Sequence, residues 1–322
     1  MKNTFDIILL TALPASGKSE VRRFLKNVSE EELKNDFHIG KNLQLDDFPY
    51  VHIMRRIDEE LFKLGKNRIF FESPDKPFKN PYDWGTLIEL INMDYKDMIL
   101  RTKYSIHAGK WIIDRIEKAS KKIGIPERLT NLDKNIIEVV AEKINKESQD
   151  IINDKYSNYT DDFSDKTIII EFARGGKQGS DMPLKKPFGY EYSFSKLDEE
   201  ILKKAVILYI WVTPEESRRK NEARANPNDP GSILHHGVPI DVMLNDYGCD
   251  DMFYLVEKSE IKGTVTVEKN GKKFYVPFAY FDNRIDKTSF LRDDVSKWDK
   301  DKVKEIRKMI KTATNSLFSF AR

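Results

Sequence analysis

The residues of this chain best suited to chemistry form the segment Ala12-Leu13-Pro14-Ala15-Ser16-Gly17-Lys18-Ser19. The segment matches the pattern GxxxxGK[ST] at every fixed position except the first, where alanine replaces glycine. An apolar run precedes it and a helical pattern of apolar residues follows it, which is the strand, loop and helix order that the pattern needs. The segment therefore predicts a phosphate-binding loop, although a strand, a turn and a helix start can also meet by chance.

Each residue type in this loop suits phosphate binding. Backbone N–H groups of such a loop and the positive end of the following helix form an anion site. Gly17 lets the backbone come close, Lys18 is suited to reach the β- and γ-phosphates, and the Ser19 hydroxyl is suited to bind Mg²⁺. We therefore expect ATP to contact the following residues: Leu13, Pro14, Ala15, Ser16, Gly17, Lys18, Ser19 and Glu20.

Two adjacent carboxylates follow the next expected strand, residues 42–45. Phosphoryl transfer needs one carboxylate to accept the proton of the acceptor and another to hold Mg²⁺ directly or through water. Asp46 and Asp47 are candidates to divide these roles, with Asp46 also a metal candidate. A solvated turn in which an aspartate caps the next helix is the simpler alternative for the pair taken alone.

A third acid ends a buried strand pattern at residues 167–172. Glu171 is the candidate to orient the water shell of a metal beside Ser19, because an acid on a buried strand needs a partner. Arg174, Gly175 and Gly176 follow it, and both an anion-binding loop and an ordinary glycine turn explain them.

A basic helix is expected to begin near Pro214, after a strand at residues 205–212. Arg218 and Arg224 lie in this helix and are candidates to stabilise charge on the transferring phosphoryl group. Glutamates at helical spacing offer the alternative of simple surface ion pairs. We expect residues 214–231 to form a lid, since residues 226–231 are rich in Pro and Gly. We expect His235 and His236 to be loop residues rather than metal ligands.

The elements that must position these residues alternate between strands and helices. Near-continuous apolar runs at residues 5–11, 68–71, 167–172 and 205–212 predict strands covered on both faces, and apolar residues at helical spacing separate them. This order predicts an α/β fold, a three-layer sandwich with a mostly parallel sheet. The expected parts are the first part of the core (1–73), a helical insertion that caps the substrate (74–164), and the rest of the core (165–322) with an added hairpin (264–276), a last strand (277–281) and a C-terminal helix.

Composition narrows the class of protein. The 55 basic and 53 acidic residues nearly cancel, which argues against nucleic acid as a partner. One cysteine excludes an internal disulfide, and no signal peptide or membrane-spanning run is seen, so we expect a cytoplasmic protein without a membrane partner. The oligomeric state is not indicated.

Four segments resemble the P-loop kinases of small molecules, in particular the nucleoside and nucleotide kinase group with its uridine kinase-like, adenylate kinase-like and zeta-toxin-like members. They are ALPASGKS, LQLDDF, IIIEFARGG and WVTPEESRRKNEAR. The resemblance implies the P-loop NTPase fold, the cofactors ATP and Mg²⁺, and an acceptor base at Asp46 or Asp47. It also implies that Asn283 and Arg284 lie near adenine. Glu171-Phe172 replaces the usual acid-glycine pair, so the acceptor is not implied.

The leading hypothesis is an ATP-dependent kinase whose acceptor is a nucleoside, nucleotide, sugar or cofactor precursor. Phe48, Tyr50, Tyr82 and Trp84 are aromatic candidates to line its pocket or its core. The alternative is a nucleotide-dependent switch without an acceptor. A third hypothesis, phosphorylation of nucleic-acid ends, lacks the basic groove it needs.

Overall fold

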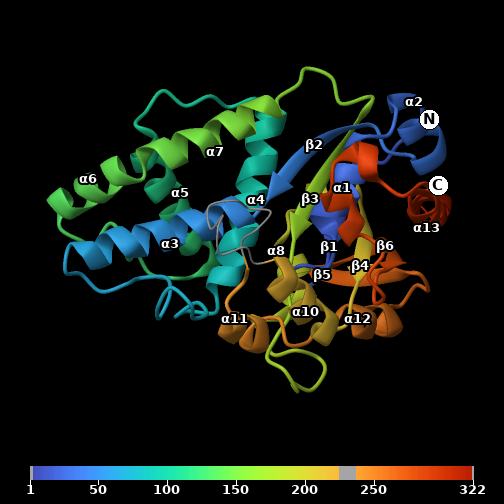
Figure 1. Cartoon of the computed structure of the whole chain (residues 1–322). Coiled ribbons are helices and arrows are strands. Elements are labelled where there is room, and N and C mark those ends of the chain that lie inside the picture. Colours follow the sequence, from blue (N-terminus) through green and yellow to red (C-terminus); the bar gives the residue numbers. More distant parts are fainter. Residues whose placement is uncertain (1–2, 225–236, 321–322) are drawn as a thin grey trace.

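The computed structural model describes residues 3–224 and 237–320, and its core is one six-stranded sheet (Figure 1). The strand order is β2-β3-β1-β4-β6-β5, and every neighbouring pair is parallel except β5 and β6. The strands are β1 (Ile7–Thr11), β2 (Lys41–Asp46), β3 (Lys166–Phe172), β4 (Ala205–Trp211), β5 (Thr264–Lys269) and β6 (Lys272–Asp282). The predicted α/β fold with a mostly parallel sheet is confirmed.

Helices cover both faces of this sheet. The α-helices are α1 (Lys18–Lys26), α2 (Glu30–Phe37), α3 (Phe48–Lys63), α4 (Asp83–Leu100), α5 (Ala108–Ile123), α6 (Lys134–Lys143), α7 (Asn145–Ser157), α8 (Gly189–Lys196), α9 (Glu199–Leu202), α10 (Pro214–Arg224), α11 (Ile240–Asn245), α12 (Met252–Lys258) and α13 (Lys300–Phe320). Two 3₁₀ turns, η1 (Ser289–Arg292) and η2 (Val295–Lys297), precede α13.

Alternation along β1 divides the core between the two faces. Ile8 and Leu10 pack with α1, α2 and α13, whereas Ile7 and Leu9 pack with α4, α8 and α12. Side chains alternate across a strand, so a strand covered on both faces must be apolar at every position. This explains why β1, β3 and β4 appear as uninterrupted apolar runs in the sequence.

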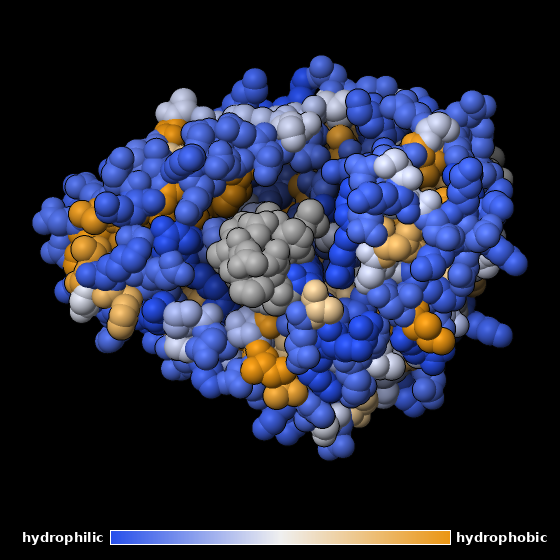
Figure 2. Space-filling view, in the orientation of Figure 1, coloured by the Kyte–Doolittle hydropathy of each residue, from blue (hydrophilic) through white to orange (hydrophobic). Residues whose placement is uncertain are grey.

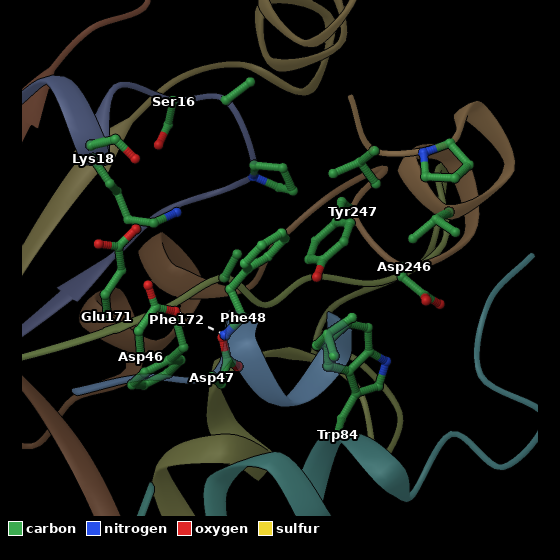
Figure 3. A pocket seen from close by; sticks show the side chains of 18 of the residues that line it. Ser16, Lys18, Asp46, Asp47, Phe48, Trp84, Glu171, Phe172, Asp246 and Tyr247 are labelled. Carbon is green, nitrogen blue, oxygen red and sulfur yellow. Dashed lines mark hydrogen bonds between the residues drawn. The ribbon is translucent and has the colours of Figure 1, made fainter. Parts of the chain in front are cut away.

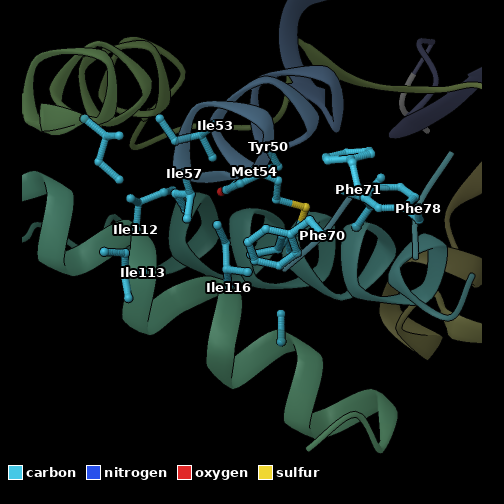
Figure 4. Packing of buried hydrophobic residues seen from close by; sticks show 14 of the residues in the cluster. Tyr50, Ile53, Met54, Ile57, Phe70, Phe71, Phe78, Ile112, Ile113 and Ile116 are labelled. Atoms are coloured by element: carbon cyan, nitrogen blue, oxygen red, sulfur yellow. The ribbon is translucent and has the colours of Figure 1, made fainter. Parts of the chain in front are cut away.

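The helices α4 to α7, all within residues 74–164, build a third core together with α3 (Figures 1 and 4). The helix α4 serves two cores, because Leu87 and Leu90 face α3 and α5 while Ile88 and Ile91 face the sheet. A helix that is apolar around most of its circumference is expected in such a fully buried position. The helical region is therefore packed firmly against one side of the sheet.

The prediction of a strand at residues 68–71 is wrong. The segment forms only a single bridge, between Phe71 and Phe78. The buried Asp58 carboxylate accepts hydrogen bonds from the N–H groups of Ile69, Phe70 and Phe71 at 2.6–3.1 Å. These donors are thus used by a side chain, so they are not available to a sheet.

The predicted hairpin is confirmed, but it is not separate from the predicted last strand. The strand β6 runs for 11 residues, pairing with β5 at its start and with β4 at its end. Asn270 and Gly271 both have positive φ at the turn, as a tight hairpin turn requires. The expected strand at 42–45 and the expected C-terminal helix are also present, as β2 and α13.

The face of the molecule that Figure 2 shows is mostly polar. In the view of Figure 2, apolar side chains occur in small separate groups between charged ones. Within residues 3–224 and 237–320, no helix combines the length and the apolar character needed to cross a membrane.

Candidate functional site

The loop between β1 and α1, residues 12–17, ends in a backbone conformation that requires glycine. Gly17 has φ of 108°, and a Cβ there would lie 2.5 Å from the Thr288 hydroxyl and 2.8 Å from the Asn283 amide nitrogen. Ala15 also has positive φ, while Ala12 does not. The methyl at Ala12 is therefore accommodated in the core without the left-handed backbone that a glycine would permit.

Side chains from distant elements hold the backbone of this loop. The Asn283 amide donates to the Ser16 carbonyl at 2.6 Å, and the Ser217 hydroxyl of α10 donates to the Pro14 carbonyl at 2.7 Å. Lys220, also on α10, is buried and pairs with Asp286 at 2.9 Å. The two hydrogen bonds to the Pro14 and Ser16 carbonyl groups restrain the backbone of the loop.

Asn283 therefore has a different position from the one the resemblance implies. It is fully buried against the loop and does not line the pocket described below. Arg284 lies on the surface, where it pairs with Asp282 and its guanidinium stacks 3.6 Å from the centre of the Trp211 ring. The predicted adenine contacts of both residues stay predictions, and for Asn283 the structure shows a role in holding the loop.

The loop end of the pocket has hydrogen-bond donors that find no acceptor in the described part of the protein. Within residues 3–224 and 237–320, no side chain caps the N-terminus of α1 and the buried Ser16 hydroxyl has no hydrogen-bond partner. The Lys18 side chain is buried and lies 3.4 Å from the Leu13 carbonyl. Burial lowers the pKa of Lys18, and the nearby carboxylates of Glu171, Asp46 and Asp47 oppose this shift. A site with such donors is suited to an anion.

The predicted cationic residues of α10 separate in the structure. Arg224 lines the pocket and is an electrostatic neighbour of Lys18, and burial lowers the pKa of its guanidinium. Arg218 is not among the lining residues and pairs with Glu215 at 3.1 Å. Glu20, predicted to contact the nucleotide, lines the pocket and accepts a hydrogen bond from Arg292 at 2.6 Å. The part of the predicted lid beyond residue 224, with His235 and His236, lies outside the described residues.

Strand register brings the predicted acids together at the carboxyl edge of the sheet. Asp46, the last residue of β2, is directly opposite Glu171 of β3. Arg22 from α1 forms an ion pair with Glu171 and lies 3.7 Å from Asp46. Burial, together with the negative charges of Glu171 and Asp47, raises the pKa of Asp46 to about 7. This crowding of carboxylates favours an additional cation at the edge.

Asp47 has its own partner. Its carboxylate pairs with Arg174 at 2.6 Å, and Arg174 is only 2% exposed. The guanidinium also lies 4.9 Å from the centre of the Trp84 ring. Burial raises the pKa of Asp47, and Arg174 opposes the shift. Two interpretations were open for residues 174–176, an anion-binding loop and an ordinary glycine turn. The anion-binding loop loses support, because the Arg174 guanidinium already forms an ion pair with Asp47.

The glycines after Arg174 permit a close approach of two backbones. A Cβ on Gly175 would lie 2.4 Å from the Cys249 carbonyl, and Gly176 forms a bridge to Cys249. The segment that carries Asp246 and Tyr247 is thereby held beside the end of β3. No turn signal near residue 246 could have placed these two residues at the site.

The pocket continues from the loop, past the acids, into a chamber of aromatic rings. Figure 3 shows Ser16 and Lys18 on one side, Trp84, Asp246 and Tyr247 on the other, and Phe48 between them. Of the predicted aromatic residues, Phe48 and Trp84 line this pocket. Tyr50 is a core residue that donates to Asp94 at 2.7 Å, and Tyr82 is 46% exposed.

The predicted metal ligands lie near each other but do not form a closed site. Ser19, Asp46 and Glu171 all line the pocket. In the part of the chain that the structure describes, no group of three His, Cys, Asp or Glu side chains is arranged to hold a metal. Mg²⁺ in nucleotide sites uses one or two protein oxygens together with phosphates and water. One hydroxyl and two carboxylates are compatible with that kind of site.

Sequence reasoning missed several residues of the pocket, among them Arg55, Phe78, Asp246 and Tyr247. Arg55 lies in a stretch with apolar residues at helical spacing, but no motif marks any of these four residues, and only packing brings them to the site. Comparison of the chain with protein-family models, curated proteins and solved structures finds no significant match.

Proposed function

We propose that this chain is a P-loop kinase that transfers the γ-phosphoryl group of ATP to a hydroxyl group of a small acceptor. The observation that carries the proposal is one pocket that connects the N-terminus of α1, the carboxylates of Asp46, Asp47 and Glu171, and an aromatic chamber. An anion site and an apolar chamber on either side of acidic residues suit a triphosphate donor and an organic acceptor that meet at those acids.

The loop end supports phosphate binding. Lys18 would place its ammonium group against the β- and γ-phosphates, and the Ser16 hydroxyl and the N–H groups at the start of α1 would donate to phosphate oxygens. Arg224 faces the same part of the pocket and would stabilise charge on the transferring group. These cations cost free energy to bury, and an anion would offset that cost.

Ser19, Asp46 and Glu171 would hold Mg²⁺ on the phosphate side. The ion neutralises charge that develops on the phosphate oxygens during transfer. The raised pKa of Asp46 fits this role, because burial and the repulsion from Glu171 and Asp47 both raise it, and a bound cation would offset that repulsion. Arg22 would keep Glu171 oriented by its ion pair.

Asp47 would then act as the acceptor base. Its ion-pair partner Arg174 lies over the ring of Trp84, which places Asp47 next to the aromatic chamber. Asp46, in contrast, is directly opposite Glu171. In the proposed step the acceptor oxygen bonds to the γ-phosphorus, the bond from that phosphorus to the β-phosphate oxygen breaks, and the acceptor proton passes to Asp47. ADP leaves with the electron pair of the broken bond.

The test is ADP release from Mg-ATP with a panel of nucleosides, nucleotides, sugars and cofactor precursors, for the wild type and Lys18→Ala. We expect an acceptor-dependent rate that falls by about a hundredfold or more in Lys18→Ala. Lys26→Ala is the matched control, because Lys26 is exposed on the last turn of the same helix. Circular dichroism of both variants establishes that the fold is retained.

The outcomes separate the candidate functions. Full activity of folded Lys18→Ala would remove the assignment of the phosphate loop. A slow, Lys18-dependent rate that no acceptor increases would favour a nucleotide-dependent switch over a kinase.

A further inference from the structure

The aromatic end of the pocket has the features of a recognition site for one chemical class of acceptor. We call it the acceptor chamber and define it by Phe48, Arg55, Phe78, Trp84, Asp246 and Tyr247, all of which line the pocket. They come from α3, the segment before α4, α4 itself and the segment after α11. The chamber lies opposite the loop end of the pocket in Figure 3.

The wall of the chamber is a continuous series of rings. Phe78 packs edge-on against Trp84 with ring centres 5.0 Å apart, and Trp84 packs against Tyr247 at 5.6 Å. Phe71 extends the series by stacking on Phe78 at 4.5 Å. Rings that are held by one another present fixed faces and edges, which favour a planar ligand over a flexible one.

Asp246 adds a polar group to this apolar wall. The residue is 4% exposed, and its carboxylate has neither a hydrogen bond nor an ion pair within residues 3–224 and 237–320. Burial raises the pKa of Asp246 to about 7, and the charge of Arg55 opposes the shift. Because Asp246 lines the pocket and no protein donor in these residues engages its carboxylate, that carboxylate is available to accept hydrogen bonds from a ligand.

Arg55 does not offer a free anion site. One of its guanidinium nitrogens donates to the Pro74 carbonyl at 2.7 Å, and the guanidinium stacks 3.8 Å from the centre of the Phe71 ring. Arg174, the other arginine near the chamber, pairs with Asp47. Phosphate groups are usually bound by several arginine or lysine donors. The described part of the chamber is therefore poorly suited to an acceptor that already carries a phosphate.

We propose that the acceptor chamber binds a planar heteroaromatic alcohol, whose ring packs against Trp84 and Tyr247 and whose N–H or O–H groups donate to Asp246. A nucleoside and a hydroxymethyl heterocycle share this chemistry, whereas a nucleotide and a sugar without an aromatic ring do not. The proposal rests on the proposed kinase function for the role of the alcohol, which would be directed toward Asp47. Ring binding itself does not depend on that function.

The first measurement is binding, by isothermal titration calorimetry of the full chain. The probes are adenosine, guanosine, cytidine and uridine, their 5′-monophosphates, pyridoxine as a hydroxymethyl heterocycle, and ribose. We expect one ring alcohol to bind at least tenfold more tightly than its phosphorylated counterpart and than ribose. Nucleoside and pyridoxine arms distinguish the two sources of the shared chemistry.

The second measurement compares Asp246→Asn with Asp241→Asn. Asp241 lies on α11 near Asp246 but is outside the pocket. We expect Asp246→Asn to weaken the preferred ring alcohol by about tenfold to a hundredfold, since a hydrogen bond to a charged group is lost. The effect should appear in KM for the acceptor with kcat for ADP release nearly unchanged, and Asp241→Asn should match the wild type.

Each outcome decides one of the two proposals. Two results would overturn the acceptor class while supporting the kinase function. In the first, ADP release depends on Lys18 but is faster with ribose or the monophosphates. In the second, ADP release depends on Lys18 but is unchanged in Asp246→Asn. Ring binding that depends on Asp246 without any ADP release supports the chamber and overturns the kinase. Absence of binding by every ring alcohol in the panel overturns the chamber as a ring site.

Discussion

Replacing Arg174 by methionine should destabilise the protein through the carboxylate that it leaves behind. Arg174 is 2% exposed and pairs with Asp47 at 2.6 Å. Methionine keeps much of the side-chain volume but leaves Asp47 buried without its cation. Removing one partner of a buried ion pair costs about 3–5 kcal/mol, whereas removing both can be nearly neutral.

The expected change in melting temperature follows from chain length. An unfolding entropy of about 2.1 cal/mol/K per residue gives roughly 0.7 kcal/mol/K for 322 residues. A loss of about 3–5 kcal/mol then lowers the melting temperature by about 4–7 °C. The loss should be larger at pH 8 than at pH 5, because protonation of Asp47 removes the unpaired charge.

Calorimetric melting of Arg174→Met, Asp47→Asn and the double variant tests this reasoning. Arg219→Met is the matched control, because Arg219 makes a contact of the same 2.6 Å length with Glu216 but is 57% exposed. Exposed pairs one helical turn apart contribute only about 0.2–0.5 kcal/mol, so the control should shift by less than about 1 °C. The double variant should recover most of the loss. Strictly additive single effects, or an equal loss in Arg219→Met, would refute the argument.

Two further predictions concern the loop and the chamber. Gly17→Ala should lose ATP binding, measured by calorimetry, because the added Cβ would meet Thr288 and Asn283. Gly124→Ala is the control and should bind ATP normally, since Gly124 has a similarly positive φ but its added Cβ would meet no described atom within 4 Å. Equal loss of binding in both variants would show that backbone strain alone matters. Asp246→Asn should raise the melting temperature relative to the wild type, and the difference should grow as pH rises from about 4 to 8. The reason is that folding raises the pKa of Asp246 to about 7, so the wild type loses stability as that carboxyl ionises. A difference in melting temperature that is independent of pH would contradict the burial of this charge.

Local patterns were enough to predict most of the sheet. Strands covered on both faces must be apolar throughout, so β1, β3 and β4 were visible as runs. The run at residues 68–71 looked the same but is not a strand, because Asp58 takes its backbone donors and its rings fill the core between α3 and α5. Burial was predicted correctly there, while pairing depended on a side chain 11 to 13 residues away.

The acids of the site were predicted better than their partners. Asp46, Asp47 and Glu171 lie at or beside the carboxyl ends of β2 and β3, and parallel strands end at one edge, so their proximity follows from strand order. That Asp47 would pair with Arg174, and Asp46 with Arg22, depends on which way each side chain turns in the packed core. The adenine contact of Asn283 stays a prediction, whereas its burial under the loop follows from the path of β6 and has no signal in the local sequence.

The sequence by itself determined the loop at residues 12–17, the parallel sheet and the acids at its edge, because these depend on residue types at short spacing. Only the tertiary structure decided the acceptor chamber. Phe48, Trp84 and Asp246 are separated by about two hundred residues and meet through packing of α3, α4 and the segment after α11. Such contacts arise from the collective burial of three apolar cores, and no short stretch of residues records which faces will meet.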